Sequence, residues 1–129
     1  MKRKTIFLLS LVFAVASFGQ SADNQMTGGA VNGRFWMSLP SDMKATLLLG
    51  FREGIVASRN FEAVKAYISD AATIGEVKKS IDQFYDDPAN LAIAVKDASR
   101  VFVMKLSGAA PERLAAEVAT LRRAAQAAQ

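Results

Sequence analysis

The chain has 129 residues, of which 51% are hydrophobic, and it contains no cysteine and no histidine. The missing cysteine excludes a disulfide framework, and the absence of both residue types excludes the usual zinc ligands, the commonest general base and a thiolate nucleophile. Sixteen Lys and Arg against twelve Asp and Glu give the whole chain a net charge of +4.

Residues 1–19 show the order of features that is typical of a secretory signal peptide. Three cationic residues near the N-terminus precede an apolar run over 6–16, and a small-residue exit at 17–19 follows. We expect cleavage after Gly19 or Ser21. The apolar run is shorter than the roughly 20 residues that cross a bilayer, which favours a cleaved leader over an uncleaved membrane anchor. The sequence therefore predicts a periplasmic or secreted protein.

The positive charge of the chain lies mainly in this leader. Three of the sixteen Lys and Arg fall within residues 1–19 and none of the twelve Asp and Glu do, so the mature chain keeps thirteen basic and twelve acidic residues. The remaining basic residues are scattered, without the interleaved aromatic residues that a nucleic-acid stacking surface needs. We therefore expect no nucleic-acid partner and, after removal of the leader, no membrane contact.

The exported part is expected to form a helical domain over residues 29–109, preceded by a flexible leader over 20–28 and followed by an Ala-rich helix over 110–129. A chain of about 110 residues buries somewhat over 60% of its unfolded surface, which is enough for a core without disulfides. The first packed element is expected to be a short helical segment that ends near Pro40.

A longer helix is predicted over residues 41–58. Its Leu47, Leu48, Phe51 and Ile55 recur at helical intervals, which indicates one apolar stripe that faces a core.

Two glycines, Gly50 and Gly54, lie four residues apart on one face of this helix. Each costs about 1 kcal/mol relative to Ala in a helix interior. We expect close packing of another helix backbone against them as the reason for that cost. A binding groove with a bare backbone floor is the alternative.

Two more helical segments are predicted over residues 60–70 and 73–85. The second begins with the clearest start signal of the chain, because Thr73 and Glu76 have the spacing of a capping box. Apolar residues then recur on one face until about Tyr85.

Residues 91–106 are densely apolar, and Val101-Phe102-Val103 alone is compatible with a β-strand. We expect a helix, because the apolar positions hold a 3.6-residue period and Gly108 stands where a helix C-terminal glycine belongs. Pro111 suits the first turn of a last helix. The sequence predicts an all-α fold, a small orthogonal or irregular bundle of four to five helices.

We expect no catalytic, cofactor-binding or metal-binding residues. Ser41 and Lys44 have the Ser-x-x-Lys spacing of penicillin-binding enzymes, but the companion motifs are absent, so we interpret them as a helix start. Asp82, Asp86 and Asp87 form the densest acidic cluster. It lacks the glycine and the ligand number of a calcium loop, so we interpret it as a solvated helix end.

Four short motifs follow one another within residues 31–106. They are Gly50-Phe51-x-x-Gly54, Thr73-x-Gly75-Glu76-Val77, Phe84-Tyr85 before Pro88, and Ala94-Val95-x-x-Ala98. In order and spacing the chain resembles the Rap/Tai family of immunity proteins against type VI secretion amidases. The resemblance implies a small all-helical periplasmic protein, often dimeric, that plugs the active site of a peptidoglycan-cleaving amidase. Typical members carry cysteines that staple the helices, one of them at the position of Leu48 here.

The leading hypothesis is an exported binding and inhibitory protein whose partner is a protein such as a cell-wall amidase. Its expected contact is formed by Phe84, Tyr85, Asp86 and Asp87, because an aromatic anchor ringed by charge suits an interface. The residues alone leave a core position for both aromatic side chains as the alternative.

Other classes of function stay open at this point. A self-associating envelope protein would use the Gly50 and Gly54 face or the last helix, and a homodimer fits either hypothesis. A small-molecule carrier would need a cavity of about 300 Å³ or more. An enzyme is the least favoured class because the usual catalytic residue types are missing.

Overall fold

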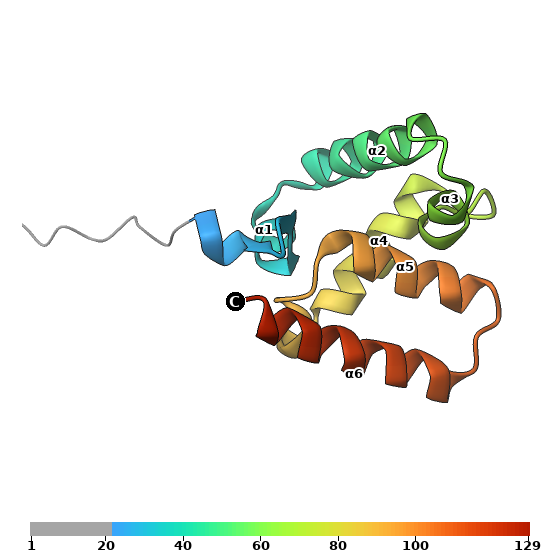
Figure 1. Cartoon of the computed structure of the whole chain (residues 1–129). Helices are drawn as coiled ribbons and strands as arrows, with labels where there is room; N and C mark the ends of the chain where they lie inside the picture. Colours follow the sequence, from blue (N-terminus) through green and yellow to red (C-terminus); the bar gives the residue numbers. More distant parts are fainter. Residues whose placement is uncertain (1–21) are drawn as a thin grey trace, which may run out of the picture.

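The structure is a computed structural model that describes residues 22–129, and its fold is all-α (Figure 1). The α-helices of this part of the chain are α1 (Gly33–Ser38), α2 (Ser41–Ala57), α3 (Phe61–Tyr67), α4 (Ile74–Tyr85), α5 (Val95–Leu106) and α6 (Pro111–Ala127). The shorter elements are the 3-10 helices η1 (Ala22–Gln25) and η2 (Pro88–Asn90) and the antiparallel strands β1 (Met26–Thr27) and β2 (Ala30–Val31). The expected small helical bundle is confirmed, with one α-helix more than predicted. The predicted signal peptide lies outside the described residues.

Helix α5 lies at the centre of the arrangement. It packs against α3, α4 and α6, while α2 packs against α3 and α4. Figure 1 shows α2 along one edge of the molecule and α6 along the opposite edge, with α4 and α5 between them. One side of α2 therefore points away from the rest of the described chain.

The predicted start of α4, the glycine after α5 and the proline at the start of α6 are confirmed. The Thr73 hydroxyl accepts a hydrogen bond from the Glu76 amide at 3.2 Å, and the Glu76 carboxylate accepts one from the Thr73 amide at 2.7 Å, which completes the capping box. Of the apolar run over 91–106, residues 95–106 are helical and not a strand, whereas 91–94 lie before the helix and Ala94 forms an isolated antiparallel bridge with Asn32. Gly108 adopts a φ of +79° just after α5, and Pro111 is the first residue of α6.

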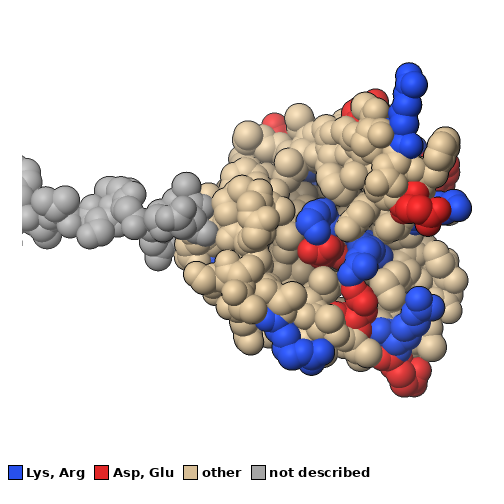
Figure 2. Space-filling model, in the orientation of Figure 1, with Lys and Arg blue, Asp and Glu red and all other residues tan. Residues whose placement is uncertain are grey.

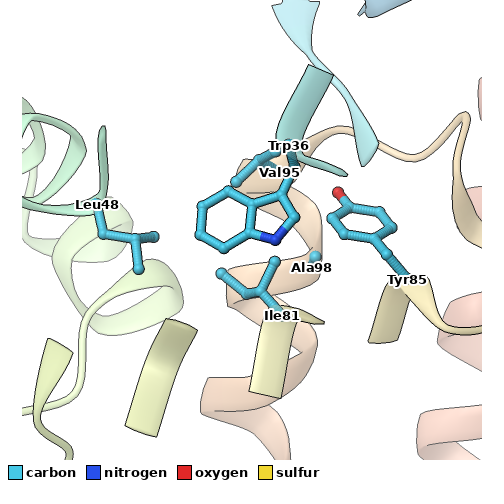
Figure 3. Packing of buried hydrophobic residues seen from close by; sticks show 6 residues of the cluster. All are labelled: Trp36, Leu48, Ile81, Tyr85, Val95 and Ala98. Carbon is cyan, nitrogen blue, oxygen red and sulfur yellow. The ribbon is translucent and has the colours of Figure 1, made fainter. Parts of the chain in front are cut away.

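The core is built around Trp36, which is fully buried. Figure 3 shows its indole between Leu48 on one side and Tyr85 on the other, with Ile81 beneath it. Val95 and Ala98 of α5 complete the cluster. Since burial of a large apolar side chain contributes about 1.5–3 kcal/mol, this cluster holds four of the helices together.

The segment expected to be a flexible leader is ordered from residue 22 onward, which corrects the prediction for that part. Its hairpin turns at Gly28 and Gly29, whose φ values of +56° and +78° are those of a tight primed turn. The Thr27 hydroxyl donates to the Ala92 carbonyl at 2.7 Å. Fully buried Asn32 donates from its amide to the Asn24 carbonyl at 3.0 Å. The hydrogen bond from Thr27 fixes the hairpin to the domain, and the one from Asn32 joins η1 to the residue before α1.

Candidate functional site

The aromatic part of the predicted contact at residues 84–87 belongs to the core. Tyr85 is 2% exposed, and its hydroxyl donates to the Ile93 carbonyl at 2.9 Å. Burial raises the pKa of the Tyr85 phenol, and the charge of Asp97 raises it further. Phe84 is half-buried and packs edge-on against Tyr85 with ring centroids 5.3 Å apart. The predicted aromatic anchor is therefore wrong for Tyr85, because the ring fills the space beside α1.

The two acidic residues of that prediction, Asp86 and Asp87, have different surroundings. Asp87 accepts from the Ala89 amide at 2.9 Å and from the Arg122 guanidinium at 2.5 Å. The hydrogen bond from the Ala89 amide lowers the pKa of Asp87; desolvation opposes this, and the charge and hydrogen bond of Arg122 lower the pKa further. Arg122 also donates to the buried Asn90 side chain at 2.9 Å. Asp87 thus helps to attach α6, whereas Asp86 is exposed.

Gly50 and Gly54 have no close neighbour in the described chain. A Cβ built on either glycine meets nothing within 4 Å, and both residues are exposed. The predicted close approach of another helix is therefore wrong within residues 22–129. The reason is that buried Leu48 directs the opposite side of α2 toward α4.

The exposed side of α2 is nevertheless largely apolar. We call it the α2 face, and it consists of Thr46, Leu49, Gly50, Glu53, Gly54, Val56 and Ala57. Leu49 is 48% exposed and Val56 is 50% exposed. In Figure 2 the upper edge, where α2 runs in Figure 1, is mostly tan, with small red areas and a blue side chain near its right-hand end. Farther down the same view, blue and red side chains alternate.

The turn after α2 extends this surface. Arg59 is exposed and adopts a φ of +54°, which is the left-handed region that favours glycine. Phe61, the first residue of α3, is 77% exposed, the largest fraction among the bulky exposed apolar side chains of residues 22–129. An exposed phenylalanine beside an apolar helix face is typical of an interaction surface.

A second polar cluster, which the sequence did not reveal, lies under the other side of α2. The Asp82 carboxylate accepts from the Trp36 indole N–H at 2.8 Å and from the Lys44 ammonium at 2.7 Å. Lys78 lies 3.4 Å from its other oxygen. Partial burial raises the pKa of Asp82, but the hydrogen bonds from Lys44 and Trp36 and the charges of both lysines outweigh it, so the pKa lies below its usual value. All the described polar groups here are paired, so the cluster is structural.

The cavities of the described part are small or open. An apolar cavity of about 30 Å³ lies between α2, α3, α4 and α5, well below the roughly 300 Å³ that a ligand carrier needs. A hollow of about 580 Å³ beside the start of α6 is open, and its Arg100 pairs with Glu117. These cavities give no support to the carrier hypothesis.

Within residues 22–129 no three side chains of the metal-binding types gather into a possible ion site. None of the helices in that range is both long and apolar enough to cross a membrane. Comparison with family models, with curated proteins and with solved structures finds no match for this chain.

Proposed function

We propose that this protein is an exported helical protein that acts through contact with another protein at the α2 face. The observation that carries the proposal is the pair of half-exposed apolar side chains, Leu49 and Val56, on a helix whose opposite side is already buried in the core. A helix that is apolar on both sides is normally covered on both sides.

The charge of the α2 face supports a protein partner. Glu53 is the one charged residue among its seven members. Interface centres are depleted in charge and rich in apolar contact, and a charged rim surrounds them. Nucleic acid, by contrast, needs several cations on one face.

The resemblance to Rap/Tai immunity proteins supplies a partner class. Under this proposal the partner is a peptidoglycan-cleaving amidase, and binding blocks its active site. The contact at residues 84–87 no longer supports this, because Tyr85 is buried. The α2 face and Phe61 take its place.

The proposal is tested with the full chain expressed with its leader and recovered from the periplasm. The amidase is one encoded beside the gene, and the measurement is its release of cell-wall peptides. We expect wild type to inhibit at equimolar concentration and Leu49→Glu to lose at least about tenfold in inhibition, because a carboxylate placed in an interface is not solvated.

Leu106→Glu is the matched control, since Leu106 is 45% exposed at the far end of α5. It should inhibit like wild type. Equal inhibition by Leu49→Glu and wild type would contradict the α2 face as the contact surface. An absence of inhibition by wild type and by every variant would contradict the amidase as the partner.

A further inference from the structure

We infer that Met43 is a site of reversible oxidation by hydroperoxides, and that the sulfoxide formed there weakens binding of the partner at the α2 face. The inference rests on the proposed function, because it names a way in which binding at that face is regulated.

Methionines carry all the sulfur of this protein, because the chain has five of them and no cysteine. Within residues 22–129 the most exposed is Met43 at 53%, followed by Met37 at 46% and Met26 at 37%, whereas Met104 is half-buried. An oxidant dissolved in water must reach the sulfur, so oxidation follows solvent exposure. Met43 is therefore the described thioether that such an oxidant reaches most easily.

The position of Met43 on α2 links its oxidation to binding. Met43 lies three residues before Thr46 and seven before Gly50, and side chains at these intervals lie on one side of a helix. The neighbouring Lys44 points to the inner side, since its ammonium lies 2.7 Å from the Asp82 carboxylate. Met43 therefore extends the α2 face by one turn toward the start of the helix.

The oxidation is a two-electron oxygen transfer. The Met43 sulfur attacks one oxygen of the hydroperoxide, the O–O bond breaks as the S–O bond forms, and the other oxygen leaves as water or as an alcohol. A flexible apolar thioether thus becomes a polar sulfoxide. A polar group buried in a contact without a hydrogen-bond partner lowers the affinity by about fivefold or more. Oxidation of Met43 therefore weakens the contact at the α2 face.

Reduction restores the thioether and makes the change reversible. Two thiols supply two electrons and two protons, the sulfoxide oxygen leaves as water, and the thiols form a disulfide. Since this chain has no cysteine, neither the oxidation nor the reduction leaves a disulfide in it. The chemical change at the α2 face is thus confined to the methionine.

Hydrogen peroxide is the probe, applied to the full chain recovered from the periplasm. Peptide mass spectrometry follows the oxidation of each methionine with time and needs no partner. We expect Met43 to gain one oxygen at least about threefold faster than half-buried Met104, while the circular dichroism spectrum stays that of the untreated protein. A Met43 that reacts no faster than Met104 would contradict the site.

Two variants separate Met43 from the other exposed methionines, and leucine keeps each surface apolar in both. The double variant Met26→Leu/Met37→Leu retains Met43, and Met43→Leu retains the other two. After peroxide treatment we expect the double variant to lose at least about fivefold in amidase inhibition, and Met43→Leu to inhibit like its untreated form. Methionine sulfoxide reductases with dithiothreitol should return the treated double variant to the inhibition of its untreated form.

Equal inhibition by the treated and the untreated double variant would overturn the inference and leave the proposed function intact. A loss in treated Met43→Leu as large as that in the treated double variant would also overturn it, because the sensitive group would then lie elsewhere. If untreated wild type does not inhibit the amidase, the proposed function fails, and the inference fails with it.

Discussion

The ring of Tyr85 lies against the backbone of Gly33 so closely that a Cβ built on the glycine would meet two ring carbons at 2.4 Å. The same Cβ would lie 3.0 Å from the Cα of Leu91. This contact joins the start of α1 to the end of α4, and it is the physical reason why Tyr85 is buried and unavailable to a partner.

Gly33→Ala should therefore destabilise the fold by about 3 kcal/mol, at the upper end of the cost of overpacking, because neither the ring nor the Leu91 backbone can move freely. Chemical denaturation measures this. Gly75→Ala is the matched control, since its nearest contact, the Thr73 hydroxyl, is 3.9 Å away, and its stability should equal or exceed that of wild type. A Gly33→Ala protein as stable as the control would contradict the contact.

Gly54→Ala should instead stabilise the fold and raise the free energy of unfolding by about 1 kcal/mol. The glycine is exposed in a helix interior with open space around it. Chemical denaturation at about 1 µM protein measures this. A loss of stability at low concentration would reveal a neighbour that the structure lacks.

Acid should remove the contribution of Asp82 to stability. Its pKa in the folded protein lies below the usual value, so the unfolded state binds the proton more readily. The stabilisation is then fully present above about pH 4 and is lost as the pH falls through the folded-state pKa.

Asp82→Asn should accordingly lower the free energy of unfolding by about 1–2 kcal/mol at about pH 7, because the charged partner of Lys44 is lost while an acceptor for Trp36 remains. The difference from wild type should shrink toward zero near pH 2. Asp86→Asn, exposed at the end of the same helix, should differ little from wild type at either pH. A difference that persists undiminished in acid would exclude the carboxylate as its source.

The attachment of α6 to the rest of the domain should depend on Arg122 and not on the adjacent Arg123. Arg122→Ala removes the donor to buried Asn90 and should cost about 1–2 kcal/mol. Arg123→Ala loses only an exposed hydrogen bond to Thr120 of the same helix and should cost little. Thermal unfolding of the two variants compares them directly, and equal midpoints would argue against the attachment of α6 through Arg122.

Mass spectrometry of the periplasmic protein should show a mature N-terminus at Gln20 or Ala22, as cleavage after Gly19 or Ser21 requires. Replacement of two residues of the apolar run by arginine should block export and leave the precursor in the cytoplasm. Recovery of intact chain from the membrane would instead identify an uncleaved anchor.

Helix positions were predictable because their signals are local. The capping box at Thr73 and Glu76 involves atoms three residues apart, and Gly108 and Pro111 act on the chain ends beside them. The N-cap of α1 was not predicted: the Asn32 side chain accepts from the amides of Arg34 and Phe35, and an asparagine directly before a helix is itself a start signal. The expected burial of Leu48 was correct because it lies on the apolar stripe of α2.

The candidate site was less predictable because it depends on which helix sides meet. The sequence around Tyr85 and around Gly50 does not say whether these residues face the core or the solvent. Tyr85 is buried because α1 packs against α4, and Gly50 is exposed because it lies on the open side of α2.

The sequence by itself determined the helical class of this protein, the starts of α4 and α6, the end of α5, and the lack of thiol and imidazole chemistry. These properties depend on residue type and on neighbours within one or two helical turns. Only the tertiary structure decided that Trp36 and Asp82, 46 residues apart, form a partly buried hydrogen bond, and that α2 keeps an apolar side free. Such relationships arise from the packing of whole helices, in which each side chain competes with all others for the same core.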